Sequence, residues 1–176
     1  MGNDKKSIEV LSISLEMEKK GYDFYMKAAN KSTNELGKKT FAALAEDEKR
    51  HAEAIEKYQE SISGGKASPQ LKTAVASHKN IKERLLFGKS EAERLKDLSV
   101  DADELKAYDV AMQLEKDGRD YYKKALESLE DEKVKDLYKF LISEEEAHFD
   151  IIFRTAEYLK DPGGWFAKEE GHFFEG

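Results

Sequence analysis

The chain has 176 residues, of which 38% are charged and only two are proline, and it contains no cysteine. This balance is typical of long, solvated helices, and the length suits one domain with a real core. The net charge of −7 argues against a nucleic-acid binder, while the lack of cysteine excludes disulfides, thiolate-bound iron centres and a thiol nucleophile.

No stretch of the sequence has the character of a targeting or membrane segment. Residues 1–6 lead directly into an amphipathic pattern, without the apolar run of a signal peptide. No apolar run approaches the length that a membrane-spanning helix needs. We therefore expect a cytoplasmic protein with neither a membrane nor a nucleic acid as partner.

Two long helices are predicted in the first half of the chain. Apolar residues recur at three- and four-residue steps over about 5–29 and again over about 34–62. The polar segment 31–34 can cap the second helix, and Gly64-Gly65 ends it. Three ionisable residues fall within the apolar stripes, where core residues are expected: Glu18, Glu48 and His51.

Two further helices are predicted in the second half. The third follows residues 99–101, where Asp101 and Glu104 make a plausible capping box, and the fourth starts near Asp131 and stops at the turn 161–164. Again three ionisable residues lie on the apolar stripes: Glu115, Glu145 and His148.

The segment between the halves, residues 63–100, is too long for a simple hairpin. It suits a crossover that returns the chain to the other end of a four-helix bundle. Within it we expect a weak helix over 67–84, a short helix over 91–98 capped by Ser90, and apolar contacts to the bundle. The residues expected to make those contacts are Ile81, Leu85, Leu86 and Phe87.

The predicted domain is thus an all-α bundle over residues 1–160, followed by an aromatic tail at 161–176. We expect the tail to pack on the bundle or on a partner subunit. Its aromatic residues are Trp165, Phe166, Phe173 and Phe174.

The two halves form an internal repeat with an offset of 97 residues and no gap. Each half holds a Glu and, about thirty residues later, a Glu-x-x-His. The matching pairs are Glu18 and Glu115, Gly21 and Gly118, Tyr25 and Tyr122, Ala28 and Ala125, Leu44 and Leu141, Glu48 and Glu145, and His51 and His148. The repeat predicts a pseudo-two-fold bundle.

Hairpin geometry places the two glutamates of each half at one level. Glu18 and Glu48 are equidistant from residue 33, and Glu115 and Glu145 are equidistant from residue 130, so each pair faces across its hairpin. A Glu and a His three residues apart share one helix face and can hold one metal ion. Two metals at the centre of the bundle follow from this arrangement.

Charge balance supports the same site, because buried carboxylates must be neutralised and no Lys or Arg lies on the stripes at that level. Two divalent ions balance four Glu and two neutral His. We infer Glu18 and Glu115 as terminal ligands, Glu48 and Glu145 as bridging ligands, and His51 and His148 as one ligand to each metal. This mixed set suits two iron ions, with manganese as the alternative, and leaves coordination positions open for an oxidant.

Two pairs beside these ligands have two possible roles each. Tyr25 and Tyr122 lie two turns after Glu18 and Glu115 and either hydrogen-bond the carboxylates or serve as ordinary core residues. Gly21 and Gly118 either make room at the metals or allow close helix packing.

Other ionisable residues near the motifs are interpreted as solvated. They are Glu16, Glu46, Asp47, Glu144 and Glu146, together with the histidines His78 and His172.

At these residues the chain resembles the rubrerythrin-type branch of the ferritin-like superfamily. The segments that carry the resemblance are Leu-Glu-Met-Glu-Lys-Lys-Gly-Tyr-Asp-Phe-Tyr and Gln-Leu-Glu-Lys-Asp-Gly-Arg-Asp-Tyr-Tyr, together with the paired Glu-x-x-His motifs. The resemblance implies a non-haem di-iron centre that reduces hydrogen peroxide, or oxidises Fe(II), in the cytosol of anaerobic or microaerophilic microbes. It also implies a homodimer.

Two departures from that family are visible. Without cysteine there is no rubredoxin domain, so peroxide or O₂ reduction needs an external electron-donor protein. Classical rubrerythrins carry a seventh ligand, a Glu one turn beyond the Glu of the third helix, and here that position is Gly118. Two other functions stay open: an iron-handling ferroxidase, and a metal-free helical scaffold or interaction protein.

Overall fold

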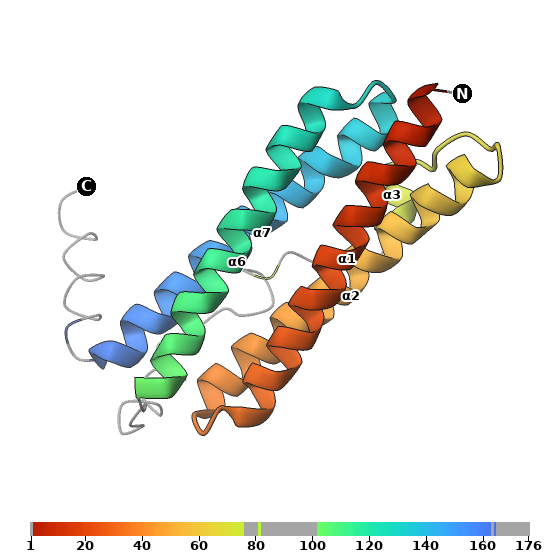
Figure 1. The fold of residues 1–176 in the computed structure, drawn as a ribbon. Helices are drawn as coiled ribbons and strands as arrows, with labels where there is room; N and C mark the ends of the chain where they lie inside the picture. Colours follow the sequence, from red (N-terminus) through yellow and green to blue (C-terminus); the bar gives the residue numbers. More distant parts are fainter. Residues whose placement is uncertain (1, 76–80, 82–101, 163, 165–176) are drawn as a thin grey trace.

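The computed structural model describes residues 2–75, 81, 102–162 and 164. This part of the chain forms helices and no strand (Figure 1). The elements are α1 (Gly2–Lys31), α2 (Glu35–Ser63), α3 (Leu71–Ala74), α6 (Ala102–Ser128) and α7 (Glu132–Lys160). The predicted all-α class and the four long helices are confirmed.

The four long helices form two antiparallel hairpins that lie side by side (Figure 1). Contacts are most extensive within the hairpins, between α1 and α2 and between α6 and α7. The end of α2 lies at the same end of the bundle as the connection from α6 to α7, whereas α6 begins at the opposite end. The end of α2 and the start of α6 therefore lie at opposite ends of the bundle, which agrees with the predicted crossover topology.

The second helix of each hairpin begins at a matched cap. Asn34 accepts hydrogen bonds from two backbone N–H groups in the first turn of α2, at 2.8 and 3.2 Å. Asp131 does the same at the start of α7, again at 2.8 and 3.2 Å. Such a cap stabilises a helix by about 1 kcal/mol. The two caps are 97 residues apart, so the repeat includes the turns of the two hairpins.

The helix ends agree closely with the pattern in the sequence. Helix α2 stops at Ser63 and is followed by Gly64 and Gly65, and Gly65 has a φ of 65° that favours glycine. Helix α7 stops at Lys160. Helix α1 is longer than expected and begins at Gly2.

Glu104 binds differently from the predicted capping box. Its buried carboxylate accepts hydrogen bonds from Ser32 Oγ and from Thr33 Oγ1, the latter at 3.3 Å, and so ties the start of α6 to the turn between α1 and α2. Asp101, its expected partner, lies outside the described residues. A Cβ at Gly37 would come within 2.6 Å of Ser32 Oγ, so this close approach requires glycine.

The core is divided into two apolar clusters along the bundle. One lies toward the turn between α1 and α2 and includes Tyr25, Phe41 and Tyr108, and the other lies toward the turn between α6 and α7 and includes Tyr58 and Leu137. A belt of buried polar residues separates them.

One residue of the crossover can be placed in this core. Ile81 is fully buried in the first cluster, as its apolar character predicts. The predicted contacts of Leu85, Leu86 and Phe87 lie outside the described residues. The same holds for the helix over 91–98 with its Ser90 cap and for the aromatic residues of the tail.

None of the helices in the described residues is long and apolar enough to cross a membrane.

Candidate metal centre

The six residues expected to bind metal converge in the polar belt. Each long helix contributes to it: α1 and α6 give one Glu each, and α2 and α7 give a Glu and a His each. None of the six is more than 5% exposed. They are Glu18, Glu48, His51, Glu115, Glu145 and His148.

Two groups of potential ligands overlap in two glutamates. One group joins Glu48 and Glu145 to Glu18 and His51, and the other joins them to Glu115 and His148, with all ligand atoms of a group within 4.8 Å of one another. Glu48 and Glu145 are therefore the carboxylates placed between two positions. That is where bridging ligands must lie, and the unshared residues lie where terminal ligands would.

The separations between ligand atoms suit an ion. Glu18 Oε2 is 3.5 Å from His51 Nδ1, and Glu115 Oε2 is 3.3 Å from His148 Nδ1. Neighbouring ligands around an ion with bonds of about 2.1 Å lie roughly 3 Å apart.

Both carboxylate oxygens lack a hydrogen-bond partner among the described residues. Buried oxygens of this kind are costly unless a cation or a donor meets them. The residues present thus fit a pair of bound cations.

The pKa values of the four carboxyl groups in the metal-free site shift in opposite directions. Burial and the charge of Glu48 raise the pKa of Glu18 to about 8, and burial and Glu115 raise the pKa of Glu145 well above its usual value. Burial also acts to raise the pKa of Glu48 and of Glu115. Hydrogen bonds from Glu18 to Glu48, and the charge of His148 near Glu115, outweigh it and lower both.

The two imidazoles hold protons in the metal-free site. Burial lowers the pKa of His51, but the charge of Glu18 outweighs it and raises the value to about 10. Burial likewise lowers the pKa of His148, but the charge of Glu115 outweighs it and raises the value well above the usual one. The raised pKa values of Glu18, Glu145 and both histidines favour bound protons in the metal-free cluster, where two metals would otherwise offset the buried charge.

Tyr25 and Tyr122 hydrogen-bond carboxylates of the opposite half. The hydroxyl of Tyr25 on α1 donates to Glu115 on α6, and that of Tyr122 on α6 donates to Glu18 on α1. Burial, and then the charge of these carboxylates, raises the pKa of both phenols. Both hydroxyls therefore stay protonated and act as hydrogen-bond donors. Of the two roles left open by the sequence, hydrogen bonding to the carboxylates is the one observed.

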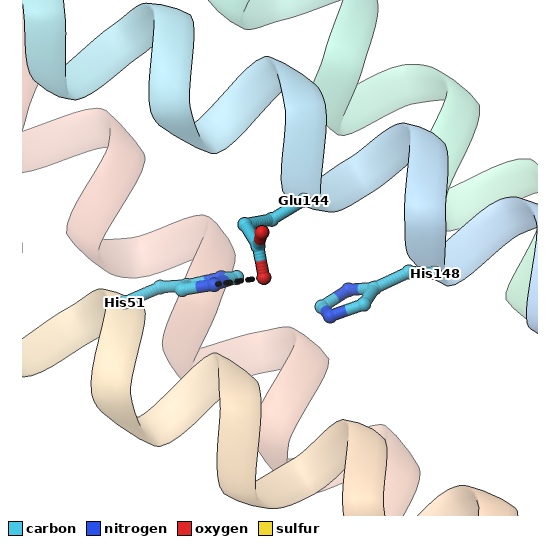
Figure 2. Close-up of side chains that lie close together, drawn as sticks. All are labelled: His51, Glu144 and His148. Atoms are coloured by element: carbon cyan, nitrogen blue, oxygen red, sulfur yellow. Dashed lines mark ion pairs between the residues drawn. The ribbon is translucent and has the colours of Figure 1, made fainter. Parts of the chain in front are cut away.

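Asp47 and Glu144 correct the interpretation from sequence, which placed both on solvated faces. Asp47 is fully buried and Glu144 is 4% exposed. Asp47 Oδ2 lies 3.4 Å from Nε2 of His148, and Glu144 Oε2 lies 4.0 Å from Nε2 of His51. Figure 2 shows the Glu144 carboxylate between the two imidazole rings. Each acid thus faces the imidazole nitrogen that points away from the Glu18 or Glu115 side.

The packing of α2 against α7 explains this burial. His51 on α2 and His148 on α7 stack with ring centroids 5.5 Å apart, so the two helices approach closely here and cover the residues beside the rings. Asp47 also accepts a hydrogen bond from Arg50, and its pKa falls to about 2 because His148 and Arg50 outweigh the opposing effect of burial. A signal was available in the sequence: Asp47 and Glu144 are a 97-residue pair, each four residues before a ligand His.

Gly21 and Gly118 make room for the shared carboxylates. A Cβ at Gly21 would lie 3.3 Å from Glu48 Cδ, and one at Gly118 would lie 3.4 Å from Glu145 Cδ. Both glycines line a cavity of about 120 Å³ between α1 and α6, which reaches Glu18, Glu48, Glu115 and Glu145. Of the two roles considered for these glycines, room at the site is the one that the contacts support.

The remaining ionisable residues near the motifs fall into two groups. Glu16, Glu46 and Glu146 are exposed, as expected. His78 and His172 lie outside the described residues.

Comparison with known proteins agrees with this geometry. The family model described as Rubrerythrin matches residues 9–157. No curated protein and no solved structure matches the chain. The matched range covers all six predicted ligands and both tyrosines, and the chain therefore belongs to the rubrerythrin family of ferritin-like di-iron proteins.

Proposed function

We propose that this chain is a non-haem di-iron oxidoreductase that reduces hydrogen peroxide, or O₂, with electrons from an external donor. The observation that carries the proposal is the pair of overlapping ligand groups that share Glu48 and Glu145 beside a cavity. Two bound iron ions, or manganese in their place, would supply the two electrons that convert a peroxide to water.

The residues around the ligands orient them. Tyr25 and Tyr122 donate hydrogen bonds to one oxygen of Glu115 and Glu18, which leaves the other oxygen of each carboxylate toward a histidine Nδ1. Asp47 and Glu144 face the two Nε2 atoms. A proton held at Nε2 leaves Nδ1 as the nitrogen that can bind a metal.

The cavity between α1 and α6 gives a small oxidant access to the site. Exposed Lys20 and Asp117 border it at the surface, and the ligand glutamates border it inside. At about 120 Å³ it accommodates peroxide or O₂ and excludes a bulky substrate.

The electrons must come from outside these 176 residues. The chain has no cysteine with which to bind a rubredoxin-type iron. We therefore propose a separate electron-donor protein or domain, and a homodimer as the assembled form.

The proposal is tested by anaerobic titration with Fe(II), followed by peroxide. We expect saturation near about two irons per chain and consumption of about one peroxide. Glu48→Ala and His148→Ala should abolish both, while the exposed neighbour Glu46→Ala serves as the matched control and should behave as wild type. If the two ligand variants consume peroxide at the wild-type rate, the proposal is wrong.

A ferroxidase or iron-handling role is the second candidate. The observation that favours it is Gly118, which stands where classical rubrerythrins have an additional Glu and leaves a symmetric six-residue ligand set. A ferroxidase oxidises many irons per chain and passes them on, whereas a peroxidase retains its two. Repeated Fe(II) additions under O₂, with size-exclusion chromatography to distinguish a dimer from a storage shell, separate the two functions.

A metal-free scaffold makes a different prediction. A ligand that binds only the folded state raises the unfolding temperature. A scaffold without a metal site would not bind added metal, so its unfolding temperature would change little.

A further inference from the structure

Each of the two buried tyrosines, Tyr25 and Tyr122, contacts two further aromatic rings. In the first half of the chain, both rings beside Tyr25 belong to phenylalanines. The Tyr25 ring lies 5.3 Å from Phe24 and 6.2 Å from Phe41, centroid to centroid. Neither neighbour carries a polar atom.

The second half uses tyrosine at both equivalent positions. The Tyr122 ring lies 5.8 Å from Tyr121 and 5.6 Å from Tyr138. These residues follow their counterparts in the first half at the repeat offset of 97. Three tyrosines in successive ring contact thus stand where the first half has Phe-Tyr-Phe.

Packing alone does not explain the hydroxyl of Tyr121. Phe24 and Tyr121 are both partly buried at the edge of an apolar cluster. Because phenylalanine fills this position in the first half, packing at the matching position does not require a hydroxyl. The Tyr121 hydroxyl donates a long hydrogen bond to the carbonyl of Val10, at 3.4 Å, and also interacts with Ser14. In contrast, the buried Tyr138 hydroxyl lies 2.5 Å from Ser14 Oγ, which is a structural hydrogen bond.

The difference between the rings is chemical. A phenol can lose one electron together with its proton, whereas a phenyl ring cannot be oxidised under comparable conditions. Tyr122 is hydrogen-bonded to Glu18, a predicted metal ligand, and Tyr121 connects its ring to the molecular surface. The first half has no such connection, because Phe24 occupies the outer position.

We propose that Tyr122 and Tyr121 form a one-electron relay that carries a stray oxidising equivalent from the metal centre to the surface. The inference rests on the proposed peroxide reduction. Conversion of peroxide to two waters takes two electrons and two protons, and the relay operates when the centre holds only one electron.

Each transfer in the relay balances. Tyr122 supplies the second electron and its phenol proton, and solvent supplies the other proton, which completes the two waters and leaves a Tyr122 radical. Tyr121 then gives an electron to Tyr122 and its own phenol proton to solvent, while a proton from the cavity that Tyr122 lines restores that phenol, so the radical moves to the surface. There a one-electron donor of the thiol or ascorbate class gives an electron, and solvent gives a proton, to restore Tyr121.

The test uses the full chain loaded anaerobically with one Fe(II) per chain, followed by peroxide in the presence of the spin trap 2-methyl-2-nitrosopropane. Peptide mapping by mass spectrometry locates the trapped radical, and electron paramagnetic resonance of parallel samples without trap gives its lifetime. Peroxide consumption by fully loaded protein is measured separately.

We expect the adduct on Tyr121 in the wild type. Tyr121→Phe should lose the surface adduct and prolong the tyrosyl signal several-fold, while consuming peroxide at the wild-type rate when fully loaded. Phe24→Tyr should gain an adduct at position 24, because it completes the same pair in the first half. Tyr138→Phe is the matched control: it removes the hydroxyl of the buried tyrosine on the other side of Tyr122 and should leave labelling of Tyr121 unchanged.

The relay is overturned if wild-type protein consumes peroxide but carries no adduct on Tyr121. An unchanged radical lifetime in Tyr121→Phe, or no adduct at position 24 in Phe24→Tyr, also overturns it. A wild-type protein that does not consume peroxide overturns the proposed function itself and the relay with it, so the two failures are distinguishable.

Discussion

The hydroxyl of Tyr122 on α6 donates a hydrogen bond to Glu18 on α1, across the boundary between the two halves of the repeat. Tyr25 returns the same hydrogen bond to Glu115. Each half of the chain therefore orients a carboxylate that the other half contributes. The site depends on the pairing of α1 with α6 as much as on the ligands themselves.

Tyr122→Phe should weaken metal binding without unfolding the bundle. The substitution keeps the buried ring but removes the donor to Glu18, and loss of a hydrogen bond that orients a ligand typically costs about 10-fold or more in metal affinity. Competition with a coloured chelator for Mn(II) measures the effect. Tyr58→Phe is the control, because that buried hydroxyl has no hydrogen-bond partner among the described residues. Equal affinities for the two variants would contradict a positioning role for Tyr122.

Asp47→Asn should also weaken metal binding, through His148. The carboxylate faces Nε2 of that imidazole and accepts a hydrogen bond from Arg50, so the amide removes the charge that fixes the ring. We expect a loss of about 10- to 100-fold in affinity. Glu46→Gln changes the exposed neighbouring residue in the same way and should have no effect. If the two variants bind metal alike, Asp47 is only a buried structural acid.

Metal binding at pH 7 should release about four protons per chain. In the metal-free protein Glu18 and His51 have pKa values of about 8 and about 10, and those of Glu145 and His148 are raised well above their usual values. All four groups must lose a proton to act as ligands. An indicator dye in weakly buffered solution, titrated with Mn(II), measures the release. Binding without proton release would show that the carboxylates are already ionised.

The metal-free protein should become less stable as the pH rises. Glu18 has a pKa of about 8 when folded against an ordinary value of 4.5, and His51 has about 10 against 6.5. The folded state binds these protons more tightly, so their stabilising effect is complete below the ordinary values and is lost as the pH rises through the folded values. The unfolding temperature should therefore fall between pH 5 and 10.

Metal-saturated protein is the control for that experiment, because the metals take the place of the protons and should flatten the dependence above neutral pH. A metal-free protein whose unfolding temperature rises over the same range would contradict the assigned protonation.

Much of the bundle could be predicted from local patterns. The caps at Asn34 and Asp131 follow from residue types that accept hydrogen bonds from a first helical turn, and Gly64-Gly65 marks the end of α2. Equal distances from a tight turn were enough to bring Glu18 level with Glu48, because the rise per residue is the same in both helices.

The burial of Asp47 and Glu144 could not be read from the stripes of single helices. Such a stripe identifies the face toward the nearest partner, whereas these two acids are covered because α2 and α7 meet at the stacked histidines. The Glu104 hydrogen bonds are similar, since Ser32 and Thr33 lie in a turn about 70 residues away. Long-range contacts of this kind depend on how the hairpins are set against each other.

The sequence by itself determined the helices, the 97-residue repeat and the six residues that converge at the centre, because helix periodicity and turn symmetry act over short stretches of chain. Only the tertiary structure decided which tyrosine serves which carboxylate. Tyr25 lies two helical turns from Glu18 on the same helix, about 10 Å along its axis, and its hydroxyl does not donate to that carboxylate. Tyr25 instead donates to Glu115 on the antiparallel α6, so the phenol reaches across the repeat rather than along its own helix.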